Sequence, residues 1–229
     1  MKTNYFVTFL CFVFIAFSSK SQESGAILRA GVNLANVSIA DNGSVDDAKM
    51  LASFQAGIIG DFHVSSILYF QPGVLFTGKG TKTQSGTEGS ANWYRATSNP
   101  YYLEMPLNIV LKTPGAVKFF GGAGPYLGVG IGGKNKVEGA LLGTGFKSEK
   151  SIEWSNDDPT TLNNEEGAGF GIMKRFDYGL DGTVGIEGKS AVLSVSYGWG
   201  LAKLQSGSNS SADNNNKHRV LSFTLGFKL

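Results

Sequence analysis

The chain has 229 residues, enough for one domain of ordinary size. Its 32 glycines, 6 prolines and 17% charged residues indicate many close backbone contacts rather than disorder. Lys and Arg together number 20 against 18 Asp and Glu, so the chain is nearly neutral, and we expect no nucleic-acid partner.

The first residues resemble an export signal. Lys2 precedes an apolar run at 5–17, and small residues follow this run. The run is shorter than the roughly 20 apolar residues that a membrane-spanning helix needs. We therefore expect a cleaved signal peptide at 1–21 and a single exported domain at 22–229. The only cysteine, Cys11, lies inside the apolar run, so we expect no disulfide or thiolate chemistry in the mature domain.

Eight later segments alternate apolar and polar residues at period two, which is typical of strands with two unlike faces. The run at 101–112 places Leu103 and Ile109 on one face, and Asn108 and Lys112 on the other. No segment shows a competing helical stripe. The eight segments are 26–39, 52–64, 67–78, 101–112, 117–132, 174–187, 191–204 and 219–229.

The connections between these segments alternate strictly between short and long. Tight turns are expected at 65–66, 113–116 and 188–190, and the remaining connections are long and polar. Short periplasmic turns and longer extracellular loops are typical of an outer-membrane barrel with an even number of strands. The pattern predicts an all-β protein: an eight-stranded antiparallel up-and-down transmembrane β-barrel in the outer membrane, with both termini periplasmic.

A secreted soluble barrel of the lipocalin kind is the main alternative, because alternation does not say which face is inside. The polar face carries small residues such as Gly122, Gly124 and Gly198, which suit a narrow barrel interior better than a hydrated surface. The apolar face carries large side chains, with aromatic residues near the strand ends, as in interfacial girdles. The expected interfacial aromatics are Phe62, Phe76, Tyr101, Phe119, Trp199 and Phe227.

The run "GVGIGGKN" at 128–135 nearly matches a phosphate-binding loop. Gly128, Gly130 and Gly132 of this run share one parity with Gly122, whereas Leu127 and Val129 share the other, so these glycines belong to one face of a strand. Asn135 replaces the hydroxyl that such a loop needs for the magnesium ion. We expect no nucleotide and no cofactor.

Charged residues on the polar face are expected to meet inside the barrel. Strand direction places near the periplasmic end Arg29, Asp61, His63, Lys112, Glu187 and Lys228. Nearer the outside it places Glu104, Arg175 and Asp177, and Asp181 lies on the same polar face. Because eight strands leave an interior just filled by side chains, a salt-bridged plug is the first interpretation. A small polar conduit or gated pore is the alternative.

Catalytic and metal-binding interpretations have weaker support. A lipid-modifying enzyme would need a base near a nucleophile, and His218 precedes the last segment beside a serine-rich loop. The acidic loop at 155–166 suits either a solvated surface or a divalent cation, although its spacing does not match an EF-hand. The triplet Trp93, Tyr94 and Arg95 suits either a partner contact or a membrane-surface anchor. We assign no catalytic residue and no metal ligand, and expect no enzyme.

Several of these segments resemble the PorT-type outer-membrane beta-barrel family of Gram-negative bacteria. The resemblance covers 26–229 and is carried by "FQPGVLFTGKG", "YYLEMPLNIVLK", "FFGGAGPYLGVG" and "RFDYGLDGTVGIE", with 102–107 the most specific part. It implies a structural or accessory role in envelope assembly or protein secretion and no agreed catalytic residues. The implied partners are outer-membrane lipid and lipopolysaccharide, the outer-membrane assembly machinery during insertion, and an envelope or secretion protein.

Overall fold

A computed structural model describes residues 24–38, 48–155, 172–204 and 217–229. The expected signal peptide, Cys11, the serine-rich loop before His218 and nearly all of the acidic loop lie outside these residues. No helix in the described ranges is long and apolar enough to cross a membrane.

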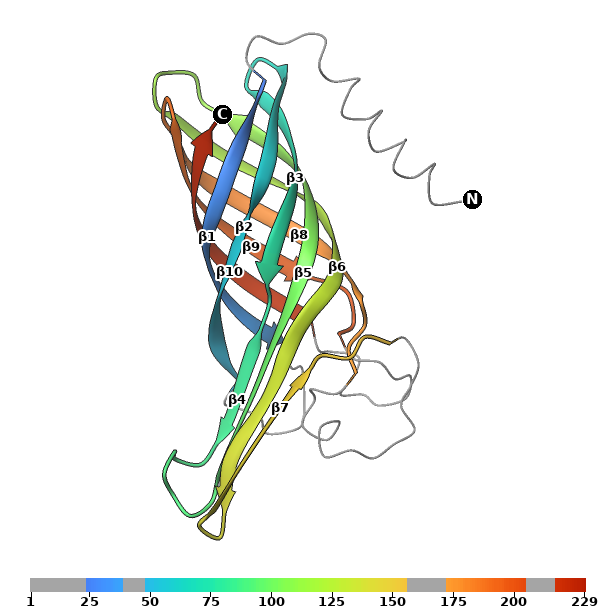
Figure 1. Ribbon diagram of the computed structural model, residues 1–229. Coiled ribbons are helices and arrows are strands. Elements are labelled where there is room, and N and C mark those ends of the chain that lie inside the picture. Colours follow the sequence, from blue (N-terminus) through green and yellow to red (C-terminus); the bar gives the residue numbers. More distant parts are fainter. Residues whose placement is uncertain (1–23, 39–47, 156–171, 205–216) are drawn as a thin grey trace, which may run out of the picture.

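The described chain is almost entirely β-strand (Figure 1). The strands are β1 (Gly25–Ser38), β2 (Ala48–Ser65), β3 (Leu68–Gly78), β4 (Thr81–Ser85), β5 (Trp93–Lys112), β6 (Lys118–Leu141), β7 (Thr144–Ser151), β8 (Phe176–Glu187), β9 (Ala191–Gly200) and β10 (Lys217–Lys228).

Eight of these strands close into a ring. Each of β1, β2, β3, β5, β6, β8, β9 and β10 pairs antiparallel with its neighbours in this order, and β10 pairs back to β1. The closing pair runs from Ile27 opposite Lys228 to Ser38 opposite Lys217. Closure leaves no free edge in the wall. The predicted eight-stranded up-and-down antiparallel barrel is confirmed.

The strands extend well beyond the predicted segments at the end with the long connections. There β4, the first part of β5, the last part of β6 and β7 form a four-stranded sheet that projects past the barrel (Figure 1). We expected polar loops after Gly78 and after Gly132, and that prediction is wrong. The alternation continues in these segments, but charged residues replace apolar ones on the outer face. The apolar face therefore ends before the strands do.

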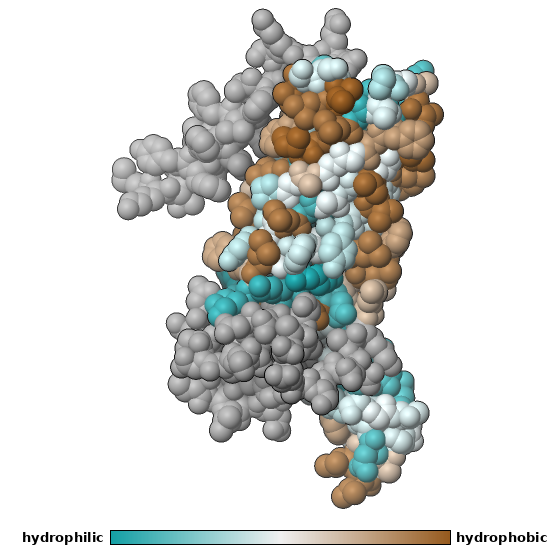
Figure 2. Space-filling view, turned by 180° about the vertical axis from the view of Figure 1, so that it is seen from behind, coloured by the Kyte–Doolittle hydropathy of each residue, from teal (hydrophilic) through white to brown (hydrophobic). Residues whose placement is uncertain are grey.

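The two faces of the wall differ in the predicted sense. On the outer face Val32 is 52% exposed, whereas its neighbour Asn33 is fully buried in the interior. Ile109 and Val110 differ in the same way. Figure 2 shows apolar side chains over the barrel wall, followed by a hydrophilic band before the projecting sheet. A lipocalin-like carrier needs the inverse arrangement, so the soluble alternative is not supported.

The glycine-rich run lies within β6, as predicted, and not in a loop. A Cβ on Gly124 would lie 2.1 Å from the carbonyl oxygen of Leu107 on β5, so only glycine allows this close approach of the strands. On the neighbouring strand a Cβ on Gly182 would meet nothing within 4 Å. The glycines therefore serve barrel packing and do not form a phosphate-binding loop.

Candidate functional site

The barrel interior at the short-turn end holds a buried ion-pair cluster. Lys112 lies with its Nζ 2.6 Å from Asp61 Oδ2 and 2.5 Å from Glu187 Oε2. Lys228 approaches the other oxygen of Glu187, also at 2.5 Å. Gln71 donates a hydrogen bond to Asp61 Oδ1 over 2.9 Å. Strands β2, β3, β5, β8 and β10 thus meet through side chains that satisfy one another's charge.

A second buried cluster lies toward the long-connection end. Lys79 forms ion pairs with Glu104 and, at 2.7 Å, with Asp177 Oδ2. Its ammonium lies 3.9 Å from the ring centroid of Tyr126, whose hydroxyl also donates to Asp177 over 3.3 Å. The sequence did not predict an interior position for Lys79, because the apolar alternation ends at Gly78. The signal for it is that Lys79 has the same parity as the inward-facing Thr77.

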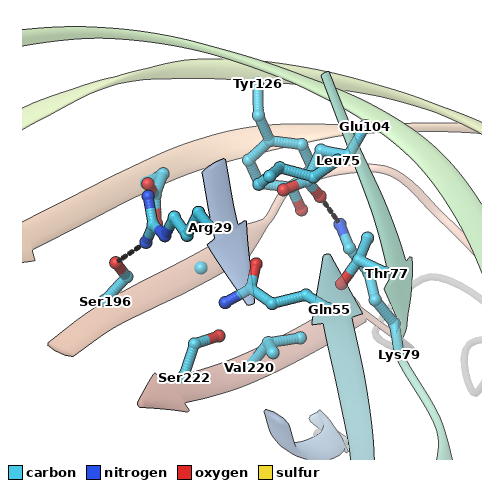
Figure 3. A pocket seen from close by; sticks show the side chains of 12 residues that line it. Arg29, Gln55, Leu75, Thr77, Lys79, Glu104, Tyr126, Ser196, Val220 and Ser222 are labelled. Atoms are coloured by element: carbon cyan, nitrogen blue, oxygen red, sulfur yellow. Dashed lines mark hydrogen bonds and ion pairs between the residues drawn. The ribbon is translucent and has the colours of Figure 1, made fainter. Parts of the chain in front are cut away.

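A polar layer around Arg29 separates the two clusters. Arg29 donates to Ser196 Oγ over 2.7 Å and to Thr224 Oγ1 over 3.1 Å. Asn108 donates to Asp181 Oδ2 over 2.9 Å. Figure 3 shows Arg29 directed at Ser196 while Lys79 extends toward the side of Tyr126. The two ion-pair clusters and this layer thus contain eight of the predicted interior residues: Arg29, Asp61, Glu104, Lys112, Asp177, Asp181, Glu187 and Lys228.

Small cavities lie between the interior side chains. Two of them, of about 20 Å³ each, are lined by Arg29; one extends toward Lys79 and Glu104, and the other toward Ile27 and Phe120. Each has room for about one water molecule.

Arg175 and His218 differ from their predicted positions. Arg175 is exposed and precedes the first residue of β8, so the predicted interior position is wrong. Arg175 shares the parity of the inward-facing Asp177, but the strand starts at Phe176, so its alternation does not extend to Arg175. His218 lies within β10, is 1% exposed, and its Nε2 lies 3.3 Å from the hydroxyl of Tyr102. His63 lies half-buried near the short turn, with its Nε2 3.1 Å from the carbonyl oxygen of Ser66.

An apolar cluster lies across the barrel mouth at the long-connection end. Ile152, Met173 and Leu204 are buried together, with Trp154 packed against them. The ring of Trp154 meets the ring of Tyr102 edge-on at 5.6 Å between centroids. The cluster thus packs on Tyr102 at the long-connection end of the interior.

The predicted interfacial aromatics lie near both ends of the wall. Phe76 and Tyr101 stack at 5.3 Å toward the long-connection end, and Phe54 joins them at 5.5 Å from Phe76. Trp199 lies at the same end with Arg219 over its ring at 5.4 Å. Toward the short-turn end lie Phe62, Phe119 and Phe227, at the ends of their strands nearest the short turns.

The projecting sheet has a charged face and an apolar free end. Arg95 pairs with Glu88 and, at 3.3 Å, with Glu138, and its hydrogen bonds lower the pKa of Glu88. Trp93, Tyr94 and Arg95 lie in β5 and not in a loop. At the free end Leu141, Leu142 and Phe146 are 65%, 84% and 44% exposed. We call these three residues the apolar tip; Figure 2 shows apolar surface at this end.

In the described ranges, no side chains come together as a catalytic or metal site. No three His, Cys, Asp or Glu side chains there lie close enough together to hold a metal ion. His218 is buried in the interior against Tyr102, away from the lipid-facing surface where a lipid-modifying base would act.

Three solved structures resemble this chain over most of its length. The attachment invasion locus protein Ail of Yersinia pestis, solved in complex with the heparin analogue sucrose octasulfate, is 14% identical, with a TM-score of 0.42 over 91% of this chain and 100% of that chain. OprG of Pseudomonas aeruginosa is 15% identical, with a TM-score of 0.45 over 90% and 96%. Neisserial surface protein A is 14% identical, with a TM-score of 0.36 over 91% and 99%. No curated protein matches the sequence.

The sequence also matches one protein family, described as the outer membrane protein beta-barrel domain, over residues 18–206. This match covers most of the chain and agrees with the closed barrel and its outward apolar face. The family assignment gives the outer membrane as the location. The match is to this broad family and not to the PorT type in particular. The chain therefore belongs to the outer membrane protein beta-barrel domain family.

Proposed function

We propose that this barrel is an accessory protein of envelope assembly or protein secretion that contacts a protein partner through its apolar tip. The PorT-type resemblance of the sequence supports the secretion role. The ion-pair clusters at two levels of the interior support an anchor that holds the projecting sheet in place.

The observation that carries the proposal is the conformation of Leu142. This residue and Gly143 form a two-residue hairpin loop between β6 and β7, with φ of 51° and 80°. A type I′ turn of this kind favours Asn-Gly, because a bulky L-residue at positive φ costs roughly 1–2 kcal/mol. Leucine is therefore a poor choice for the backbone, and at 84% exposure it is also a poor choice for solvation. A contact with an apolar surface accounts both for a leucine at a positive φ and for its exposure to solvent.

The tip is held in one position. The amide of Leu142 donates to Asn92 Oδ1 and the amide of Gly143 donates to the carbonyl oxygen of Ala91, both over 2.9 Å. These bonds tie the hairpin to the connection between β4 and β5. A preorganised apolar projection of this kind suits insertion into a groove on a protein, because little ordering entropy is lost on binding.

Replacement of Leu142 by Asn separates function from folding. A strain that lacks the protein would carry either the wild-type gene or the Leu142→Asn variant, and its exported proteins would be quantified. We expect equal amounts of barrel in the outer membrane but exported proteins at the level of the deletion strain. Full restoration by the variant would contradict the proposal. The Lys189→Asn variant, at an exposed turn on the opposite end, is the control.

A gated pore is the second candidate, favoured by the two cavities that share Arg29. Conductance across planar bilayers would test it, with Arg29→Ala as the variant that joins the cavities. A pore gated at this layer would conduct in the variant far more than in the wild type. A barrel that only anchors the sheet would stay closed in both.

A further inference from the structure

The outer face of the projecting sheet carries rows of charged residues just beyond the barrel wall. In the first row Asn99 lies opposite Lys134, and in the second Lys82, Thr97, Lys136 and Glu149 follow one another across the strands. Directly opposite residues share a face of the sheet. We call Lys82, Lys134 and Lys136 the lysine ladder.

The lysine ladder lies immediately beyond the aromatic cluster of Phe54, Phe76 and Tyr101. Tyr101 pairs with Gly132, and Lys134 is two residues further along β6, on the same face. Two residues of a strand span roughly 7 Å. Aromatic side chains of outer-membrane barrels mark the level of the lipid headgroups. The lysines therefore lie at the height of the phosphates and first sugars of the outer-leaflet lipid.

Positive charge is in excess on this face. The lysine ladder, Arg95 and Lys147 together supply five cations. The carboxylates beside them are three: Glu88, Glu138 and Glu149. Both β6 lysines of the ladder form ion pairs on this face. Lys134 lies 2.6 Å from Glu149, with side chains 70% and 42% exposed, and Lys136 lies 2.6 Å from Glu138, with side chains 36% and 20% exposed. Exposed ion pairs of this kind contribute little, so the lysines remain available to a stronger anion.

We propose that the lysine ladder binds the phosphate groups of an anionic glycolipid of the outer leaflet, which is the chemistry of lipopolysaccharide. Lysine ammonium groups act as point charges toward phosphate, while the aromatic cluster beneath them packs on the first part of the acyl chains. The carboxylates between the lysines suit the divalent cations that bridge such phosphates. The ladder thereby fixes the height and rotation of the projecting sheet above the membrane.

The test compares the wild-type barrel with the double variant Lys134→Gln/Lys136→Gln, both purified in detergent. Lipopolysaccharide would be added, and its binding measured by native mass spectrometry and by the shift in thermal unfolding. We expect the double variant to bind on the order of tenfold more weakly, since each lysine near an anionic surface contributes appreciably. The control is Lys118→Gln/Lys189→Gln, with the same charge change at the opposite end, which should bind as the wild type does.

Inorganic phosphate and phosphatidylglycerol vesicles complete the comparison. Neither should reproduce the shift caused by lipopolysaccharide, because a single free phosphate or a smaller headgroup cannot span the two rows. Equal binding by the wild type and the ladder variant would overturn the proposal. An equal loss in the control variant, or an equal shift with inorganic phosphate, would overturn it as well.

Discussion

Replacement of Lys112 by methionine should destabilise the barrel strongly. The side chains of Lys112, Asp61 and Glu187 are 1%, 4% and 2% exposed, so the substitution leaves two carboxylates in the interior without their shared cation. Breaking a buried pair in this way costs about 3–5 kcal/mol. Gln71 and Lys228 still contact the two carboxylates and hold the cost within that range. Unfolding by urea in phospholipid vesicles, followed by tryptophan fluorescence, measures the change.

A matched variant separates charge from shape. In Lys112→Met/Asp61→Asn/Glu187→Gln the carboxylates become neutral amides of nearly the same size, so we expect at least half of the lost free energy of unfolding to return. If Lys112→Met costs less than about 1 kcal/mol, the interior is better solvated than the ion-pair cluster requires. If the triple variant is no more stable than the single one, shape and not charge holds this end of the barrel.

Two further predictions concern the wall and the projecting sheet. Gly124→Ala should impair folding into vesicles, because its Cβ would overlap the backbone of Leu107. Gly182→Ala should fold normally, because nothing lies within 4 Å of its Cβ. The folded fraction of each variant is measured by the band shift on unheated gels. Because hydrogen bonds from Arg95 depress the pKa of Glu88, this contact should persist below the ordinary pKa of a glutamate and be lost only as the pH falls through the lowered value. Carboxyl NMR titration should show the Glu88 midpoint rising in Arg95→Gln, and an unchanged midpoint would contradict the contact.

The strands of the barrel wall, and the residues that face its interior, could be predicted from the sequence. Alternation in the run that contains Asn108 and Lys112 predicts which residues face inward, because the side-chain period of a strand is two and the wall separates lipid from a polar interior. Closure then follows from the even number of strands and the alternation of short and long connections.

The projecting sheet could not be found in the same way. Beyond the membrane neither face must be apolar, so alternation such as that of Lys134 and Lys136 with Asn135 and Val137 resembles a polar loop. Lys79 was missed for the same reason, although it continues the inward parity of Thr77. Arg175 was assigned to the interior because it shares the parity of Asp177, but β8 begins only at Phe176, and strand ends predicted from sequence are uncertain by a few residues.

Photo-crosslinking at position 142 in living cells tests the central claim most directly. A photoreactive residue at 142 should yield one predominant adduct with a protein, which should also be recovered when that protein is tagged and purified. The same residue at lipid-facing Ile131 should give no such adduct. If 142 gives no protein adduct, or the same products as 131, the apolar tip does not contact a partner and the proposed function is wrong.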